Sequence, residues 1–220
     1  MVMRDRIKAE LGDLAHPKFL VYLMGPYKSF DIEAVLEQIE TKEGDSLASI
    51  PENVDFKALT GSDIDSRQQE VALDLLLHVR DQLRTDPGVN AFLAIDIDIP
   101  LEEIDAATQS IEFALASNAV VYIVPKIGDN LGVGIEVGSV LEAIFHKEDS
   151  SMAKAHRERV LFIHESGVRS AMIAAVQDRW EARIYAYSDR VDLVRQIRLF
   201  VRDIARRELR GDLPSFDLVD

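Results

Sequence analysis

The chain has 220 residues, of which 39 are aspartate or glutamate and 25 are lysine or arginine, and its formal net charge is −14. The acidic balance argues against a nucleic-acid polymer as partner, and no apolar run is long enough to predict a membrane span. The absence of cysteine excludes disulfides, zinc–thiolate sites and thiol nucleophiles, and it favours a cytoplasmic location.

The charged residues also have an informative distribution. Acidic residues occur along the whole chain instead of in one tail, and arginine outnumbers lysine. A dense carboxylate surface holds water and ions, so this composition is typical of a protein adapted to high salt. An ordinary acidic cytoplasmic protein is the alternative interpretation.

From residue 18 onward, apolar runs alternate with segments of helical periodicity, which predicts a parallel sheet covered by helices. The expected strands are 19–24, 91–97, 119–124, 160–163 and 183–187. The expected helices are 66–83, 101–116, 134–145, 170–180 and 190–208. We therefore expect an α/β fold, a flavodoxin-like, doubly wound, five-stranded parallel sheet with helices on both faces, in a single domain over residues 1–210.

Two segments depart from this alternation. Residues 28–65 are rich in Gly, Ser, Asp and Pro, and a loop of this length inside a compact domain is usually functional. We expect it to be a long insertion or lid that follows the first strand. Residues 211–220 are expected to form a peripheral C-terminal tail.

In doubly wound sheets, ligands bind outside the carboxyl ends of the strands. The first strand end is followed by Gly25-Pro26-Tyr27, with Phe30 shortly after. Gly25 permits close backbone approach, and the two aromatic rings could stack on a nucleobase. An ordinary Gly-Pro turn is an equally good interpretation of the same residues.

The second strand end carries Asp96 and Asp98, which strand alternation would place on one face at the mouth of the sheet. Two carboxylates there could bind Mg²⁺, orient ribose hydroxyls or act as a base. A strand end that simply runs into solvent is the alternative. The fourth strand end, His164-Glu165-Ser166-Gly167, could line the same mouth. The five histidines lack the spacing of metal ligands, so they predict no metal site.

The third strand is preceded by Ala116-Ser117-Asn118 and followed by GDNLGVGIEVG, which opens a predicted helix. This arrangement, with the LMGPY ending of the first strand, resembles the nucleoside 2-deoxyribosyltransferase-like superfamily and its Gly-x-Gly-x-Glu-x-Gly motif. The resemblance covers most of residues 18–146 and implies the flavodoxin-like fold already expected. It implies that Glu136 is the nucleophile that attacks the anomeric carbon. A helix-start glutamate that interacts with its own helix dipole is the alternative for this residue.

The resemblance also implies which residues surround the ligand, a nucleoside or nucleotide. The two motif glycines, Gly132 and Gly134, let the backbone approach the sugar or phosphate. The polar residues around the third strand are Ser117, Asn118, Asp129 and Asn130. The chemistry requires no metal and no organic cofactor. The resemblance further implies a homo-oligomer.

The chain departs from the superfamily at several acidic positions. It has Asn118 and Asn130 where acids are usual, and Ser110 near a position that usually holds an aspartate. An amide cannot act as a base or protonate a leaving nucleobase. Two hypotheses therefore remain: an N-glycosidic bond hydrolase or deoxyribosyltransferase-like enzyme acting through Glu136, and a non-catalytic nucleotide-binding or sensing module on the same fold.

Overall fold

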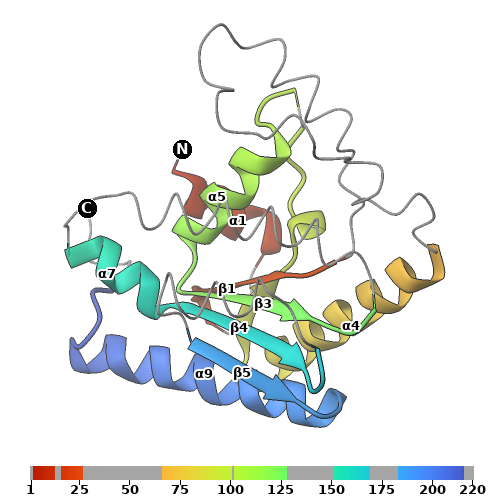
Figure 1. Ribbon diagram of the computed structural model, residues 1–220. Coiled ribbons are helices and arrows are strands. Elements are labelled where there is room, and N and C mark those ends of the chain that lie inside the picture. Colours follow the sequence, from red (N-terminus) through yellow and green to blue (C-terminus); the bar gives the residue numbers. More distant parts are fainter. Residues whose placement is uncertain are drawn as a thin grey trace, which may run out of the picture.

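The computed structural model describes residues 2–12, 16–26, 66–100, 102–127, 151–168 and 183–215. Five parallel strands form one sheet in the order β2-β1-β3-β4-β5 (Figure 1). The strands are β1 (His16–Met24), β2 (Val89–Phe92), β3 (Ala119–Val124), β4 (Val160–Glu165) and β5 (Arg183–Tyr187). This is the flavodoxin-like order, so the expected α/β fold is confirmed.

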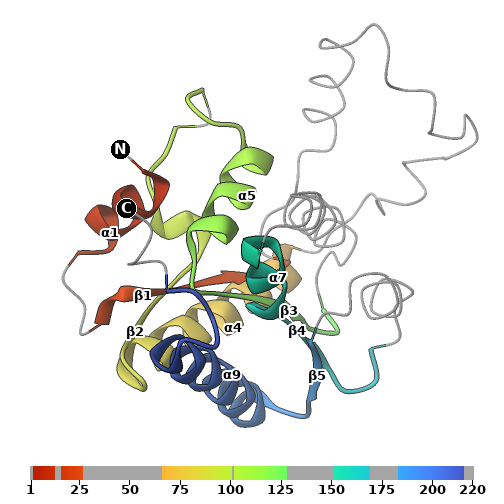
Figure 2. The ribbon, with the colours of Figure 1, turned by 90° about the vertical axis from the view of Figure 1, so that its left-hand side faces the viewer.

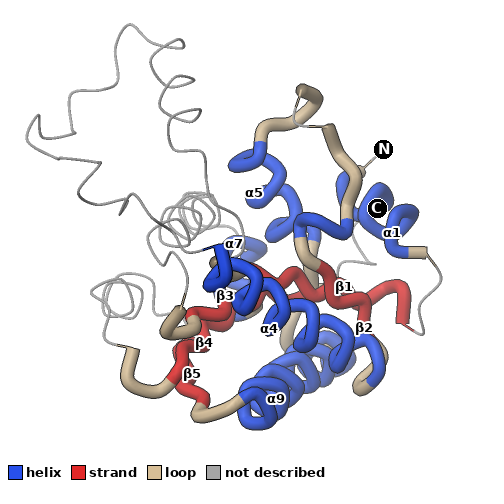
Figure 3. The backbone as a smooth tube through the Cα atoms, turned by 90° about the vertical axis from the view of Figure 1, so that its right-hand side faces the viewer, coloured by secondary structure: helices blue, strands red, loops and turns tan. Residues whose placement is uncertain are grey.

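The described helices cover both faces of the sheet (Figure 2). They are α1 (Met3–Leu11), α4 (Ser66–Thr85), α5 (Ala106–Ala116), α7 (Ser151–Glu158) and α9 (Arg190–Arg210), with a short 3₁₀ helix η1 (Ala94–Asp96). In Figure 3 the strands form the middle layer, with α4 and α9 on one side and α1 and α5 on the other. None of the described helices is both long and apolar enough to cross a membrane.

Alternating strand residues build a separate core on each face. Val21, Leu23 and Ile123 face α4 and α9, together with Leu76 of α4 and Ile197 of α9. The residues between them face α1 and α5, where the core is aromatic: Tyr22 stacks on Phe92 with ring centroids 5.1 Å apart, and Tyr122 stacks on Phe162 at 4.6 Å. Because β3 lies between two strands and under both helical layers, all six of its residues are buried.

The second strand is shorter than the predicted 91–97. It ends at Phe92, and the chain turns into η1 because the Asp96 carboxylate accepts a hydrogen bond from the Leu93 amide at 2.9 Å. Helix α5 likewise begins at Ala106 and not at 101, since Asp105 is its N-cap and accepts from the Thr108 amide at 3.0 Å. The pattern analysis did not predict α1 or α7. The predicted helices 134–145 and 170–180 and the expected insertion 28–65 lie outside the described residues.

The beginning of the expected C-terminal tail packs against the domain. Gly211 ends α9 with φ of 77°, which turns the chain back toward the core. Leu213 is buried beside α9, and the Pro214 carbonyl accepts a hydrogen bond from Arg159 at 2.5 Å. Leu213 and Pro214 therefore contact the folded domain, and residues 216–220 of the expected tail lie outside the described residues.

Candidate functional site

The point where the strand order reverses lies between β1 and β3. These two strands are neighbours, with Met24 paired to Tyr122, although α4, β2 and α5 separate them in the chain. Because the pairing is parallel, the segments that leave the two strands, Gly25-Pro26 and Pro125-Lys126, emerge at the same edge of the sheet. In doubly wound folds this reversal point is where ligands bind, so it is the candidate site.

Packing favours glycine at position 25. A Cβ atom at this position would lie 3.0 Å from both Leu76 methyl carbons and 3.1 Å from the Ile123 carbonyl oxygen. Helix α4 and strand β3 therefore approach the end of β1 so closely that a side chain would crowd them. The described residues explain this glycine by packing, and the close approach of a ligand to Gly25 stays a prediction. Pro26, which follows, is buried.

Glu165, at the end of β4, contacts Lys126, which is the first exposed residue after β3. One of its carboxylate oxygens accepts a hydrogen bond from the Lys126 amide at 3.0 Å, and the other lies 3.6 Å from the Lys126 ammonium. Gly167 has φ of 89° and lies beside the Lys126 side chain. Glu165 thus fixes the direction in which the chain leaves β3, immediately before the glycine-rich segment of the sequence.

Tyr187, at the end of β5, is paired in register with Glu165 and is 3% exposed. Its hydroxyl has no hydrogen-bond partner among the described residues. Burial, and to a smaller extent the charge of Glu165, raise the pKa of this phenol above its ordinary value. The hydroxyl is therefore neutral at physiological pH and keeps its proton.

The two aspartates after β2 do not converge. Asp96 is bound by two arginines of α4, Arg80 at 2.5 Å and Arg84 at 3.4 Å, in addition to the Leu93 amide. Asp98 is exposed. Asp96 therefore ties η1 to α4, and the described part of the chain contains no cluster of three or more His, Asp or Glu residues that could hold a metal ion.

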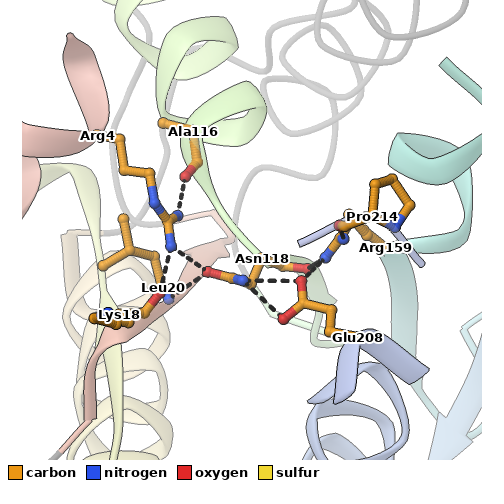
Figure 4. A network of polar contacts seen from close by, with 8 residues as sticks. All are labelled: Arg4, Lys18, Leu20, Ala116, Asn118, Arg159, Glu208 and Pro214. Atoms are coloured by element: carbon orange, nitrogen blue, oxygen red, sulfur yellow. Dashed lines mark hydrogen bonds and ion pairs between the residues drawn. The ribbon is translucent and has the colours of Figure 1, made fainter. Parts of the chain in front are cut away.

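Ser117 and Asn118 lie at the amino end of β3, the opposite edge of the sheet from Gly25 and Lys126. Both are buried. The Ser117 hydroxyl donates to the Phe113 carbonyl at 2.7 Å. The Asn118 side-chain oxygen accepts from the Leu20 amide and from Arg4, each at 2.9 Å (Figure 4). The structure therefore does not bring these two residues to the predicted site.

The other half of this network involves Arg159 and Glu208. The Asn118 amide donates to both Glu208 carboxylate oxygens at 2.9 and 3.1 Å. Arg159, 2% exposed, donates to Glu208 and to the Asn118 carbonyl at 2.9 Å. Burial lowers the pKa of this guanidinium, and the Glu208 charge opposes that shift. The network joins α1, the start of β3, the start of β4 and the end of α9, and the pattern analysis gave no indication of it.

The remaining predicted site residues lie outside the described residues: Tyr27, Phe30, Asp129, Asn130, Gly132, Gly134 and Glu136. At the described edge, the sequence pointed to Gly25, Pro26 and Glu165 but not to Lys126 or Tyr187. The sequence marks residues at this edge only by their place, because each one ends a buried apolar run or follows it. The bond that joins Lys126 to Glu165 has no sequence signal.

A search of curated proteins and of solved structures finds no significant match to this sequence. One family model matches, and it spans residues 4–217, nearly the whole chain. Its description is "Domain of unknown function (DUF7509)". The match contains every described helix and strand apart from the first residue of α1, so the chain belongs to the DUF7509 family.

Proposed function

We propose that the protein binds a nucleoside or nucleotide at the carboxyl ends of β1 and β3 and cleaves or transfers its N-glycosidic bond through Glu136. The observation that carries this proposal is the pairing of β1 with β3. It brings Gly25-Pro26 and Pro125-Lys126 to one edge at the reversal of strand order. These described residues lie next in sequence to the two features that resemble the deoxyribosyltransferases.

The proposed chemistry uses a carboxylate as nucleophile. The Glu136 oxygen bonds to the anomeric carbon as the carbon–nitrogen bond to the base breaks, which leaves a glycosyl ester and, after protonation, a free base. Water then releases the sugar in a hydrolase, or a second base releases it in a transferase. Together the two half-reactions replace one difficult displacement by two easier ones.

The position of Asn118 affects how the two sequence hypotheses compare. Taken from the sequence alone, asparagine at this position favours a non-catalytic protein, because the enzymes that the chain resembles usually have an acid there. The described Asn118 side chain is engaged with Leu20, Arg4 and Glu208 at the opposite edge of the sheet. Its amide is explained by that network, so it no longer argues against catalysis.

A nucleotide-sensing module is the second candidate, and a specific observation favours it. Two described carboxylates at the carboxyl ends of the strands already have partners, Asp96 in Arg80 and Arg84 and Glu165 in Lys126. These ion pairs make both carboxylates less suited to act as a general base. Catalysis depends on Glu136 and its sequence neighbours.

The test is base release by the wild-type protein and by Glu136→Gln, with a panel of nucleosides and nucleoside monophosphates. An enzyme releases free base, and the variant loses the activity by several orders of magnitude while it still binds the ligand, since the amide is nearly isosteric but a poor nucleophile. Glu112→Gln, on α5, is the matched control. Binding without base release in the wild type supports the sensor, and neither binding nor release overturns both proposals.

A further inference from the structure

Helix α9 is basic in an acidic protein. Residues 190–210 contain seven arginines and three carboxylates, a formal charge of +4 that leaves −18 for the rest of a chain whose total is −14. The inner face of the helix is apolar and buried, with Leu193, Ile197, Phe200 and Ile204 in the core. The arginines therefore concentrate on the faces that do not contact the sheet.

The outer face of α9 alternates apolar and basic side chains. One row, which we name the α9 stripe, consists of residues spaced three or four apart and therefore on one side of the helix: Val191, Arg195, Leu199, Arg202, Arg206 and Leu209. Its apolar members are 79%, 57% and 89% exposed, and they are three of the six large exposed hydrophobic residues in the described part of the chain. In Figure 1 this helix forms the lower border of the molecule.

Contacts with other described residues do not account for the α9 stripe. Its arginines each contact one flanking carboxylate, Arg195 with Asp192 at 2.5 Å, Arg202 with Asp86 at 2.9 Å and Arg206 with Asp203 at 2.8 Å. The three arginine side chains nevertheless remain 56–68% exposed. Exposed pairs of this kind contribute little to folding. The apolar side chains between the arginines would contribute favourable free energy only if they were buried.

The opposite side of the molecule has the complementary character. A hollow of about 450 Å³ lies between α1, the turn before α5, and α5 itself; we name it the acidic hollow, and it is lined by Met3, Arg6, Glu103, Ile104, Asp105, Thr108 and Glu112. It has three carboxylates and one arginine, and apolar Met3 and Ile104 among them. Val2, 70% exposed, and Glu102, exposed, are the chain neighbours of the lining residues Met3 and Glu103. Helices α1 and α5 cover the face of the sheet opposite to α9 (Figure 2).

We propose that the α9 stripe of one molecule docks on the acidic hollow of a second copy, head to tail. Both surfaces mix charged and apolar side chains. The stripe has three arginines, and the hollow keeps an excess of carboxylates, Asp105 and Glu112, beyond the Glu103 that pairs with Arg6. A phosphate polymer would pair with the arginines but would offer nothing to Val191, Leu199 or Leu209. Pairing of α9 with α9 in a twofold dimer would place arginines against arginines. Because the two surfaces differ and face opposite ways, the contact is heterologous and generates rings or open chains.

The test measures molar mass by light scattering over a protein concentration series in about 0.1 M salt, where charges act over roughly 10 Å. The expected mass rises with concentration above the 24.7 kDa monomer, and the rise is lost in about 1 M salt, where the range falls to roughly 3 Å. A wild-type protein that stays monomeric throughout overturns the proposal, which is independent of the proposed enzymatic function.

Two charge-reversal variants identify the surfaces. The stripe variant is Arg195→Glu/Arg202→Glu, and the hollow variant is Glu102→Lys/Glu112→Lys. Each alone should remain monomeric, whereas an equimolar mixture should associate again, because each protein then meets an opposite charge. A hollow variant that associates by itself as strongly as the wild type overturns the head-to-tail contact. Leu199→Ser, which alters no charge, should also weaken association, and circular dichroism verifies that each variant is folded.

Discussion

The Asn118 side-chain amide donates to both carboxylate oxygens of Glu208, at 2.9 and 3.1 Å, across 90 residues of chain. The same side chain accepts through its oxygen from the Leu20 amide and from Arg4. An amide is the group that this position requires, because it must donate on one side and accept on the other. A carboxylate could only accept, and it would face Glu208 with the same charge.

We therefore expect Asn118→Asp to destabilise the fold by about 2–4 kcal/mol, since it removes two hydrogen bonds and opposes two carboxylates in a buried setting. Urea unfolding measures the loss. Glu208→Gln in the same protein should recover about 1–2 kcal/mol, because the new amide can donate to the introduced carboxylate while its oxygen still accepts from Arg159. If the two changes were simply additive, the direct contact between these residues would not be the cause.

The sequence predicted the bounds of two strands, β3 and β5, well. The bounds of β3 and β5 agree with the prediction to the residue, and β3 was recognisable because it is buried on both faces and reads as a continuous apolar run. The end of β2 was wrong because Ile95, Ile97 and Ile99 alternate with aspartates as they would in a strand. The Asp96 carboxylate, which accepts from the Leu93 amide in the η1 turn, is also bound by Arg80 and Arg84 of α4, contacts that a local pattern does not reveal.

The candidate site was also predictable only in part. Gly25 was identified from its place after an apolar strand, but the reason for glycine is Leu76, which approaches from α4. Ser117 and Asn118 precede their strand, and residues that precede a strand lie at the amino edge of a parallel sheet. Their position was therefore implied by the predicted topology. Their partners Arg4 and Glu208 were not implied, because these residues lie about 90 residues or more from Asn118 in the sequence.

Gly25→Ala should cost about 1–3 kcal/mol of stability, because the added carbon would lie 3.0 Å from the Leu76 methyl groups and 3.1 Å from the Ile123 carbonyl oxygen. Chemical denaturation of both proteins measures the difference. Leu76→Ala creates space at the same point, so the double variant should lose less than the sum of the single losses. Strict additivity would show that Leu76 does not cause the crowding.

Glu165→Ala should free the Lys126 amide, which donates to the Glu165 carboxylate at 3.0 Å. We expect its hydrogen exchange to accelerate about tenfold, equivalent to about 1.4 kcal/mol, as the acceptor is lost. Glu165→Gln keeps an oxygen acceptor and should exchange much more like the wild type. Exchange at Lys126 that does not differ between wild type and Glu165→Ala would show that Glu165 does not hold this point of the chain.

Salt should stabilise the protein if its acidic composition is an adaptation to high salt. With a formal charge of −14, the folded state suffers carboxylate repulsion, and KCl screens it. Screening also weakens the described ion pairs, but most have at least one exposed partner and contribute little individually. We expect the melting temperature to rise by about 5–10 °C between low and molar KCl, equivalent to a few kcal/mol. A midpoint that stays level or falls supports the ordinary acidic protein.

Acid should unfold the protein through carboxylates of α9, of which Asp203 is the most informative. Burial opposes ionisation of Asp203, but hydrogen bonds from Arg183 at 3.0 Å and Arg206 at 2.8 Å outweigh it and hold the pKa of the carboxyl below its ordinary value. A group whose pKa is lower in the folded state adds stability that is fully present above its unfolded pKa, about 3.9 for aspartate. That contribution is lost as the pH falls through the folded pKa.

The free energy of unfolding should therefore be level from neutral pH to about pH 5 and then decline below about pH 4. Asp203→Asn should be less stable than the wild type at neutral pH by about 1 kcal/mol, because the charge-assisted bonds to two arginines are weakened. Its further loss between about pH 5 and 3 should be smaller than that of the wild type, since one titrating carboxyl has been removed. Glu102→Gln, at an exposed residue without an ion pair to any described residue, should follow the wild-type curve.

If Asp203→Asn lost as much stability in acid as the wild type, the arginine pair at Asp203 would not contribute to acid unfolding. The next carboxyl to test would then be Asp192, whose pKa is lowered by its hydrogen bond from Arg195.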